Sequence, residues 1–312
     1  MADKIATREA YGKALVEFAD KYDYVVLDAD LAEATKTVMF KKACPDRFFD
    51  CGIAEGNMIT VAAGLAAAGK VAFASSFAMF AAGRAFEQVR NSVGYPHLNV
   101  KIGATHAGIT VGEDGATHQC LEDIALMRTI PGMTVVNPAD AVEARAAVEA
   151  AITTYGPFYM RFGRAAVPVI NDNPDYKFEL GKGVLLRDGK DVTIVATGIM
   201  VSMALEAAEA LAAEGIDARV INIHTIKPID REILVKAASE TGAIVTAEEH
   251  NIIGGLGAAV SEVICEECPV PVVKVGVNDS FGRSGKVPPL LEMYGLTPEN
   301  ILEKAKKAIS LK

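Results

Sequence analysis

The sequence has little of what marks a membrane protein or a nucleic-acid-binding protein. Its hydrophobic content is 51%, yet the apolar run from Met58 to Ala68 ends at Gly69 and is too short to cross a bilayer. Acidic residues outnumber basic ones by 40 to 31, and the net charge of −9 argues against nucleic acid or an anionic membrane surface as a main partner. The N-terminus lacks the apolar core of a signal peptide, so we expect a cytoplasmic protein with no membrane partner.

Cysteine is also scarce. An odd number of cysteines, 5, in a chain without a signal peptide indicates reduced thiols rather than a disulfide framework. Cys265 and Cys268 form the one C-x-x-C pair, and no second pair completes a zinc site. The pair alone does not decide whether these thiols have a redox or metal role.

Strands and helices alternate along the chain, which favours parallel sheets covered by helices. We therefore expect an α/β protein of two open-sheet domains with helices on both faces. Asn137 and Pro138 are typical of a helix start, as N-cap and first helical residue. The expected strands cover residues 24–28, 71–74, 100–103, 133–136, 158–161, 192–196, 219–223, 243–247 and 272–275. The expected helices cover residues 53–68, 81–92, 121–128, 138–154, 201–214, 230–240, 257–266 and 298–310.

The hydrophobic periodicity is lost between residues 168 and 182, where Asn, Asp and Pro cluster as they do in linkers. Beyond this segment the alternation of strands and helices starts again. We therefore expect a first domain at residues 1–167, a linker at 168–182 and a smaller second domain at 183–312.

The densest cluster of protonatable side chains lies between Ala104 and Gln119, which reads A-T-H-A-G-I-T-V-G-E-D-G-A-T-H-Q. This loop follows an expected strand, and ligands of parallel sheets bind beyond the carboxyl ends of the strands. The sequence allows one pocket there, formed by Glu55, Phe77, Phe80, His106, Asp114 and His118. Each residue also has a structural explanation. Glu55 could be an acid at a helix start, Phe77 and Phe80 could be core residues, and the others could be polar loop residues.

Several segments, in the same order, resemble transketolase. They are F-D-C-G-I-A-E-G-N-M (49–58), S-S-F-A-M-F-A-A-G-R-A-F-E-Q-V-R-N-S (75–92), the loop 105–119, I-K-P-I-D-R (226–231) and R-S-G-K (283–286). The resemblance covers essentially the whole chain and implies a pyrimidine-binding domain followed by a transketolase C-terminal domain. The diphosphate-binding domain, whose G-D-G and Asn segments hold Mg²⁺ and the diphosphate in the family, has no counterpart in this sequence.

The resemblance implies thiamine diphosphate as the cofactor. Glu55 corresponds to the glutamate that activates the cofactor's aminopyrimidine ring, Phe77 and Phe80 to the aromatics around that ring, and Asp30 to an acid near the cofactor. At Gly83 some family members carry a further aromatic, so this chain departs from the pattern there.

The resemblance also implies a site for sugar phosphates. His106, Asp114 and His118 match residues that contact the sugar, with the two histidines moving protons. Arg8 and Arg164 match the ligands of the substrate phosphate, although Arg161 competes with Arg164 for this role. A phosphate-binding serine of the family falls on Ala34, beside Thr35, which is a further departure.

The expected function is that of the C-terminal subunit of a split transketolase, which transfers a two-carbon ketol unit between sugar phosphates of the pentose phosphate pathway. Its partner would be an N-terminal subunit that carries the diphosphate-binding domain and Mg²⁺, in a two-plus-two assembly. Three alternatives stay open: half of a deoxyxylulose-phosphate synthase, a 2-oxo acid dehydrogenase E1 beta subunit, or a non-catalytic scaffold. His106 and Glu113 argue against the synthase. The glycine-rich turn Gly254–Gly257 is a further candidate, for a nucleotide cradle, although no basic residue supports it.

Overall fold

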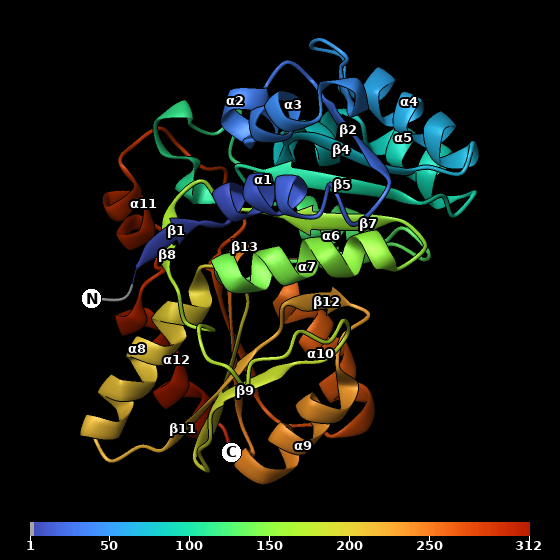
Figure 1. Ribbon diagram of the computed structural model, residues 1–312. Helices are drawn as coiled ribbons and strands as arrows, with labels where there is room; N and C mark the ends of the chain where they lie inside the picture. Colours follow the sequence, from blue (N-terminus) through green and yellow to red (C-terminus); the bar gives the residue numbers. More distant parts are fainter. Residues whose placement is uncertain (1–2) are drawn as a thin grey trace.

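Two sheets organise the chain in the computed structural model, which describes residues 3–312 (Figure 1). The first sheet has seven strands in the order β12-β6-β7-β5-β4-β2-β3, all parallel except β12 at one edge. Its strands are β2 (Tyr24–Asp28), β3 (Phe48–Asp50), β4 (Val71–Phe77), β5 (Val100–Thr105), β6 (Thr134–Val136), β7 (Phe158–Arg161) and β12 (Thr225–Lys227). The α/β fold class predicted from the alternation is confirmed.

Both faces of the first sheet are buried at its inner strands, which explains why β2 is apolar along almost its whole length. Tyr24 and Val26 of β2 pack into one hydrophobic cluster with helices α1 (Thr7–Glu17) and α7 (Ala141–Thr153). Their neighbours Val25 and Leu27 point the other way, into a cluster that includes α4 (Glu55–Ala67). This alternation is the period of two that a strand imposes on its side chains.

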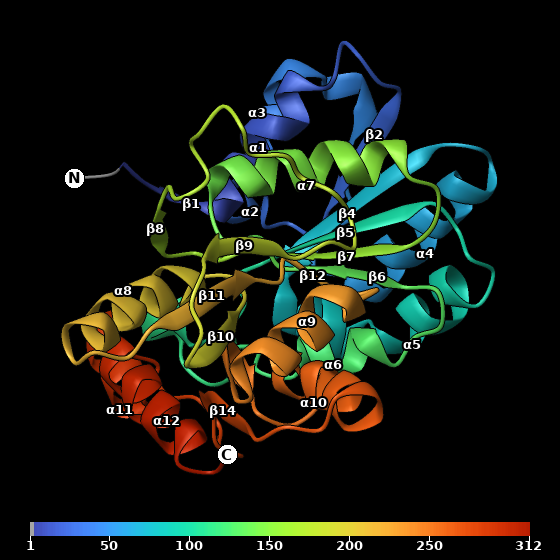
Figure 2. The same ribbon diagram turned by 90° about the horizontal axis from the view of Figure 1, so that it is seen from below.

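The second sheet has five strands in the order β14-β13-β10-β11-β9, with β9 antiparallel at its edge. Helices α8 and α12 lie on one side and α9 and α10 on the other (Figure 2). Its strands are β9 (Val184–Arg187), β10 (Val192–Ala196), β11 (Ala218–Asn222), β13 (Ile244–Asn251) and β14 (Val272–Val277). The helices are α8 (Met200–Ala213), α9 (Arg231–Thr241), α10 (Leu256–Glu267), α11 (Val287–Met293) and α12 (Pro298–Ile309).

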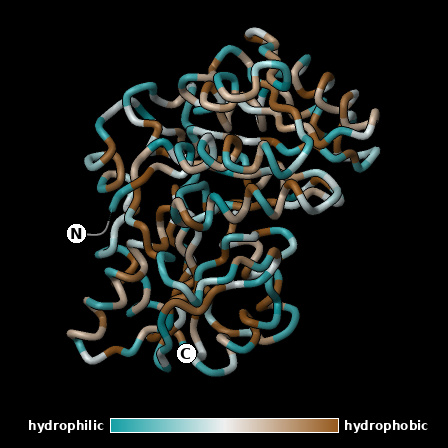
Figure 3. The backbone as a smooth tube through the Cα atoms, in the orientation of Figure 1, coloured by the Kyte–Doolittle hydropathy of each residue, from teal (hydrophilic) through white to brown (hydrophobic). Residues whose placement is uncertain are grey.

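The two sheets are joined by more than the linker. Strand β12 comes from the second half of the chain, yet it pairs with β6 of the first sheet. Lys227 Nζ then donates hydrogen bonds to the carbonyls of Arg128 (2.7 Å) and Ile130 (2.6 Å). The I-K-P-I-D-R segment therefore attaches the second half to the first. Figure 3 colours the backbone by hydropathy, and hydrophobic stretches run through the interior of the second half of the chain.

One expected helix start is wrong. The helix begins at Ala141 instead of Pro138, and its N-cap is Asp140, whose side chain accepts from the backbone N–H of Glu143 at 2.9 Å. Asn137 does not cap the helix. Its backbone N–H donates to the carbonyl of His224 at 2.8 Å. That contact with the second half keeps the backbone extended and delays the helix by three residues.

Other departures lengthen strands or change the helix type. Strands β4, β5 and β13 each continue past the expected end, so that residues near the site lie on strand ends rather than in loops. Residues 81–92, expected as one α-helix, lie instead in π-helical turns at Met79–Arg84 and Val89–Gly94 around the short α5 (Phe86–Gln88). Elements without a sequence prediction include β1 (Lys4–Ala6), β8 (Ala166–Pro168), α1, α2 (Ala32–Thr35) and α3 (Val38–Ala43), whereas α6 (Asp123–Arg128) was expected. Within residues 3–312, no helix has the length and apolarity to cross a membrane.

Candidate active site

A cavity of about 420 Å³ opens beyond the carboxyl end of β2 and the start of α4. It brings together residues that are far apart in the sequence and come from separate elements. The lining residues are Ala29, Asp30, Leu31, Ile53, Glu55, Phe80, Arg84, Thr117 and His118. Four of the residues predicted from the sequence, Asp30, Glu55, Phe80 and His118, therefore share one cavity.

Glu55 is an almost fully buried acid in the first turn of α4, with 2% of its surface exposed. One carboxylate oxygen, Oε2, accepts a hydrogen bond from Arg84 at 3.0 Å. The turn before the helix is fixed by Asp50, whose Oδ1 accepts from the N–H of Gly52 (3.0 Å) and of Asp30 (3.2 Å). Gly52 has a φ of 67°, which favours glycine at this position. Asp50 thus links the two loops that carry the acids of the cavity.

The loop of Asp30 is held by a buried carboxylate at the end of β2. Asp28 accepts hydrogen bonds from the N–H of Leu31 (2.6 Å) and from the hydroxyls of Thr35 (2.7 Å) and Thr37 (2.9 Å). Burial raises the pKa of Asp28 to about 6, because the charged form loses hydration. Asp30 itself is exposed and has a φ of 60°, an uncommon conformation for a residue other than glycine.

Four rings form a continuous aromatic group next to this cavity. Phe77, at the end of β4, stacks on His106 with ring centroids 3.8 Å apart and an interplanar angle of 23°. Phe77 and Phe80 are nearly parallel at 5.9 Å and 9°, and Phe80 meets His118 edge-on at 5.3 Å and 74°. The structure therefore brings all four predicted rings together, and the two phenylalanines are not simply core residues.

His106 is an uncharged imidazole with a defined tautomer. Its Nε2 lies 2.9 Å from a guanidinium nitrogen of Arg8, and its Nδ1 lies 2.9 Å from the Thr105 hydroxyl. Because a guanidinium can only donate, Nε2 accepts and Nδ1 carries the proton. Burial, followed by the positive charges of Arg8 and Arg164, lowers the pKa of His106 to about 3. The backbone of His106 is also strained, with a φ of 55°.

Basic side chains gather on the far side of His106. Arg8 donates to the carbonyl of Ala34 at 2.8 Å, and burial together with the nearby Arg164 lowers its pKa. Arg164 donates to the carbonyl of Val111 and lies 3.9 Å from a carboxylate oxygen of Asp114. Arg8 and Arg164 repel each other, and carboxylate oxygens of Glu113 and Asp114 lie 3.8 and 3.9 Å from Arg164. That arrangement suits an anionic ligand.

The structure separates Arg161 from Arg164. Arg161 is 3% exposed, pairs with Asp123 at 2.8 Å and donates to the backbone carbonyl of Glu249 at 2.9 Å. All of these partners are internal, so Arg161 joins the two halves of the chain. Arg164, with 36% of its side chain exposed, keeps access to solvent.

The loop that carries Asp114 is held by the second half of the chain. Ser284 Oγ donates to the carbonyl of Glu113 at 2.6 Å, and Gln119 Nε2 donates to the carbonyl of Arg283 at 3.0 Å. The R-S-G-K segment therefore fixes the G-E-D-G-x-T-H-Q loop from outside. A site residue in the first half thus depends on packing of the second.

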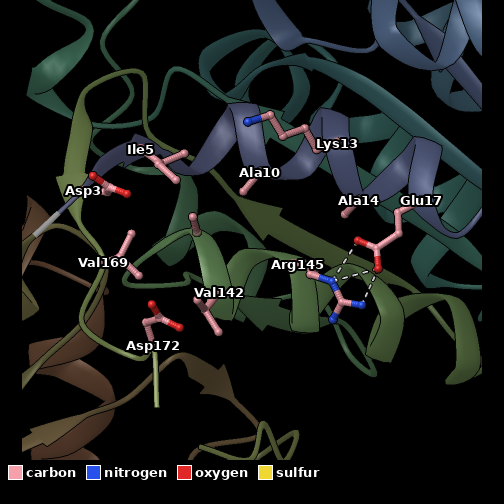
Figure 4. Close-up of a pocket in the computed structure, with 11 residues that line it drawn as sticks. Asp3, Ile5, Ala10, Lys13, Ala14, Glu17, Val142, Arg145, Val169 and Asp172 are labelled. Atoms are coloured by element: carbon pink, nitrogen blue, oxygen red, sulfur yellow. Dashed lines mark hydrogen bonds and ion pairs between the residues drawn. The ribbon is translucent and has the colours of Figure 1, made fainter. Parts of the chain in front are cut away.

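Two other candidate sites, a glycine-rich turn and a surface groove, lack the cluster of acids, rings and arginines described above. After the glycine-rich turn, the first amides of α10 already have a partner, because Glu248 accepts from the N–H of Leu256 (2.6 Å) and of Gly257 (2.8 Å). A groove of about 430 Å³ between α1 and α7 has a mostly apolar lining, with a surface ion pair between Glu17 and Arg145 at one side (Figure 4). The residues predicted for the site all lie outside that groove.

Three residues near the site had no sequence prediction. Arg84 contacts Glu55 and Phe80, Asp50 holds the two acidic loops, and Lys36 adds positive charge beside His106. Arg84 and Asp50 stand inside the segments that resemble transketolase, but a lone Arg or Asp there has no distinguishing pattern. Only the three-dimensional contacts identify them.

Comparisons with known proteins show which families and structures the chain is similar to. Residues 3–169 match the family model of the transketolase pyrimidine binding domain, and residues 181–301 match that of the transketolase C-terminal domain. A putative transketolase C-terminal section from Methanocaldococcus jannaschii is 52% identical over 95% of this chain and 94% of its own length. A 6-deoxy-6-sulfo-D-fructose transketolase subunit from a Clostridium species is 49% identical over 96% of this chain and 92% of its own. A solved structure described as a split gene transketolase, inactive beta4 tetramer, is 59% identical and superimposes with a TM-score of 0.92 over 99% of both chains.

Proposed function

The chain belongs to the transketolase family, and we propose that it is the C-terminal subunit of a split transketolase that transfers a two-carbon ketol unit from a ketose phosphate to an aldose phosphate. The observation that carries this proposal is the position of Glu55. It is a buried carboxylate that borders a cavity together with Phe80, Asp30 and His118. A scaffold subunit would have no use for that combination.

The residues of the cavity fit the aminopyrimidine end of thiamine diphosphate. Phe80 offers a flat apolar surface, and stacking on an aromatic ring contributes about 0.5–1.5 kcal/mol beyond area burial. Glu55 offers a carboxylate at the edge of the same space. When bound, the cofactor supplies an acidic thiazolium carbon that takes up the charge released when a carbon–carbon bond beside a carbonyl breaks. Glu55 would share a proton with the ring nitrogen that faces it.

Other residues of this chain act on the sugar. His118, at the mouth of the cavity, can accept or return a hydroxyl proton of the sugar. His106, whose Nε2 accepts from Arg8 and whose pKa is lowered to about 3, would take up a hydroxyl proton only where the sugar displaces Arg8 from Nε2. Asp114 is an acceptor for a sugar hydroxyl. Arg8 and Arg164, with Lys36 nearby, would bind the terminal phosphate.

We assign the diphosphate group and its Mg²⁺ to a separate N-terminal subunit, in a two-plus-two assembly with this chain. Two comparisons support this assignment: the archaeal relative is named a C-terminal section, and the similar solved structure is described as an inactive tetramer of one chain type. We expect the isolated chain to be inactive, because the residues that bind the diphosphate and Mg²⁺ would be missing without the partner.

The sugar substrates are the finer part of the proposal. Sugar phosphates of the pentose phosphate pathway are our first candidates. The Clostridium relative, named for 6-deoxy-6-sulfo-D-fructose, favours a second class, in which a sulfonate replaces the phosphate. Both are tetrahedral oxyanions that an arginine pair can bind, so transfer assays with matched phospho- and sulfo-ketoses would separate the two classes. Turnover of pyruvate instead would indicate a deoxyxylulose-phosphate synthase or an E1 beta subunit.

Calorimetry tests the split-enzyme proposal directly. The chain alone should bind thiamine diphosphate weakly, because metal-bridged contacts to the diphosphate would come from the partner. Adding the subunit that carries the diphosphate-binding domain, with Mg²⁺, should restore tight binding and transfer activity. Tight Mg²⁺-dependent binding by this chain alone would disprove the proposal.

A further inference from the structure

Arg84 contacts two groups of the proposed cofactor site at once. Its guanidinium donates to Oε2 of Glu55 at 3.0 Å and lies 4.7 Å from the centre of the Phe80 ring. All three side chains line the same cavity. Glu55 is almost fully buried, whereas 55% of the Arg84 side chain is exposed, so the ion pair bridges the protein interior and the cavity.

The π-helical turns of residues Met79–Arg84 place Arg84 in this position. Phe80 and Arg84 lie four residues apart on these wide turns, which is close enough for the guanidinium to cover the ring. Gly83 contributes space, because a Cβ there would overlap the side chain of Met79. Strand β4 ends at Phe77 immediately before, so the stretch is anchored at its start.

The two carboxylate oxygens of Glu55 are used differently. Oε2 is held by Arg84, and no residue among 3–312 donates a hydrogen bond to Oε1. A carboxylate held at one oxygen keeps a fixed plane, and its second oxygen stays available to a ligand in the cavity. An arginine suits this task better than a lysine, because its planar group can pair with a carboxylate and cover an aromatic ring together.

We propose that Arg84 is a positioning residue of the cofactor site. It fixes the plane of the Glu55 carboxylate, so that Oε1 faces the pyrimidine nitrogen, and it fixes the Phe80 ring on which the pyrimidine stacks. This inference rests on the proposed function, because it assumes that the aminopyrimidine ring occupies the cavity.

Arg84→Met tests the inference in the complex reconstituted with the N-terminal subunit. Exchange of deuterium at the thiazolium carbon of bound cofactor should slow by about 3- to 30-fold, since a charge-assisted contact is lost and solvent screening reduces its strength. The dissociation constant for thiamine diphosphate, measured by calorimetry, should rise by a similar factor. Arg84→Lys should recover only part of either loss. Unchanged exchange and unchanged affinity in Arg84→Met would overturn the inference and leave the proposed function intact.

Arg90→Met is the matched control. Arg90 is an exposed arginine in the same helical stretch, and its guanidinium contacts Asn91 instead of a site residue. Loss of an arginine there should change neither exchange nor affinity. An equal loss in Arg90→Met would show that general charge, rather than the position of Arg84, is responsible, and would overturn the inference.

The double variant distinguishes positioning from a separate role. If Arg84 sets the exchange rate through Glu55, adding Arg84→Met to Glu55→Gln should slow exchange by less than twofold further, whereas the loss of cofactor affinity that comes through the Phe80 ring should persist. A full additional slowing of exchange would show that Arg84 acts independently of Glu55 and would overturn the positioning role. Normal exchange in Glu55→Gln alone is a different result, since it would remove the proposed function as well.

Discussion

The carboxyl ends of the two sheets carry similar residues that are used in opposite ways. At the first sheet, Glu55 lines an open cavity. His106 lies next to it and contacts Arg8, which is partly exposed to solvent. At the second sheet, Glu248, Glu249 and His250 near the end of β13 are almost fully buried. Glu248 accepts from two backbone N–H groups of α10, and Glu249 accepts from the N–H of Thr110 at 2.6 Å.

The difference lies in what satisfies each acid. The acids of the second sheet accept from backbone amides, so Glu248 fixes the start of α10 and Glu249 fixes the loop at Thr110. Burial raises the pKa of Glu249, even though Arg161 and the Thr110 amide oppose this shift. Glu55, by contrast, has a half-exposed arginine on one oxygen and a cavity beside it. Position at the end of a parallel sheet is therefore not sufficient for a site, and unmet hydrogen-bonding capacity is the better criterion.

The sharpest test compares Glu55→Gln with Glu248→Gln. Both changes are isosteric, but only Glu55 is proposed to share a proton with the cofactor. Glu55→Gln should slow deuterium exchange at the thiazolium carbon of the reconstituted complex by about 10²–10⁴-fold, the range for a positioned acid–base group. Its thermal unfolding midpoint should stay near that of the unchanged protein.

Glu248→Gln should give the reverse pattern, with a lower unfolding midpoint and normal exchange, because its carboxylate holds the start of α10. If Glu248→Gln slowed exchange as much as Glu55→Gln, the contrast between the two sheet ends would be wrong. Unchanged exchange in Glu55→Gln would remove that residue from the mechanism.

A second comparison concerns the two arginines of R-F-G-R. Arg161→Met leaves Asp123 charged and buried without its ion-pair partner, and breaking such a pair costs about 3–5 kcal/mol of unfolding free energy. Arg164→Met removes a half-buried arginine whose carboxylate neighbours are 3.8 and 3.9 Å away, and its cost should stay below about 1 kcal/mol. Chemical denaturation of both variants measures the difference. Equal losses would contradict the assignment of Arg161 to the joint and Arg164 to the site.

Much of the fold follows from the sequence, because buried parallel strands leave a clear apolar pattern. Residues 24–28, 158–161 and 192–196 are strands with the expected bounds. The helix at residues 138–154 was placed too early, because a contact between Asn137 and the second half outweighs the local N-cap preference. Strand β12 had no expectation, since three residues that pair with a distant strand leave no periodic signal.

The sequence predicted the position of the candidate site but not all of its residues. Glycine-rich loops and strand ends indicated where polar residues gather, and the resemblance to transketolase named the individual side chains. The sequence could not choose between Arg161 and Arg164, because burial depends on the partner Asp123 from another element. Nor could it find Arg84. The π-helical turns direct this side chain to Glu55, and the sequence pattern does not distinguish π-helical turns from a regular α-helix.

Arg164→Ala sharpens the site side of the comparison. The Michaelis constant for phosphorylated sugars should rise by about tenfold, because one charge-assisted contact to the phosphate is lost and partial exposure weakens that contact. The constant for unphosphorylated sugars should stay within about twofold, which makes them the internal control. Steady-state kinetics of the reconstituted complex with both substrate types would measure this. A parallel rise for both would show that Arg164 does not face the phosphate.

The pH dependence of stability tests the joint between the two halves of the chain. Glu143 of α7 is fully buried, accepts from Tyr176 at 2.7 Å and Asn222 at 2.9 Å, and burial raises its pKa to about 7. Between pH 4.5 and 7 the unfolded chain has this group ionised while the folded chain keeps it protonated, so its contribution to stability falls as pH rises through this window. Glu143→Gln cannot titrate, so the stability of the unchanged protein relative to this variant should decrease by about 1–2 kcal/mol from pH 5 to pH 7. Denaturation of both proteins at the two pH values measures that difference and cancels the contributions of other groups, such as Asp28. A difference that stayed constant or grew with pH would show that Glu143 is ionised in the folded chain.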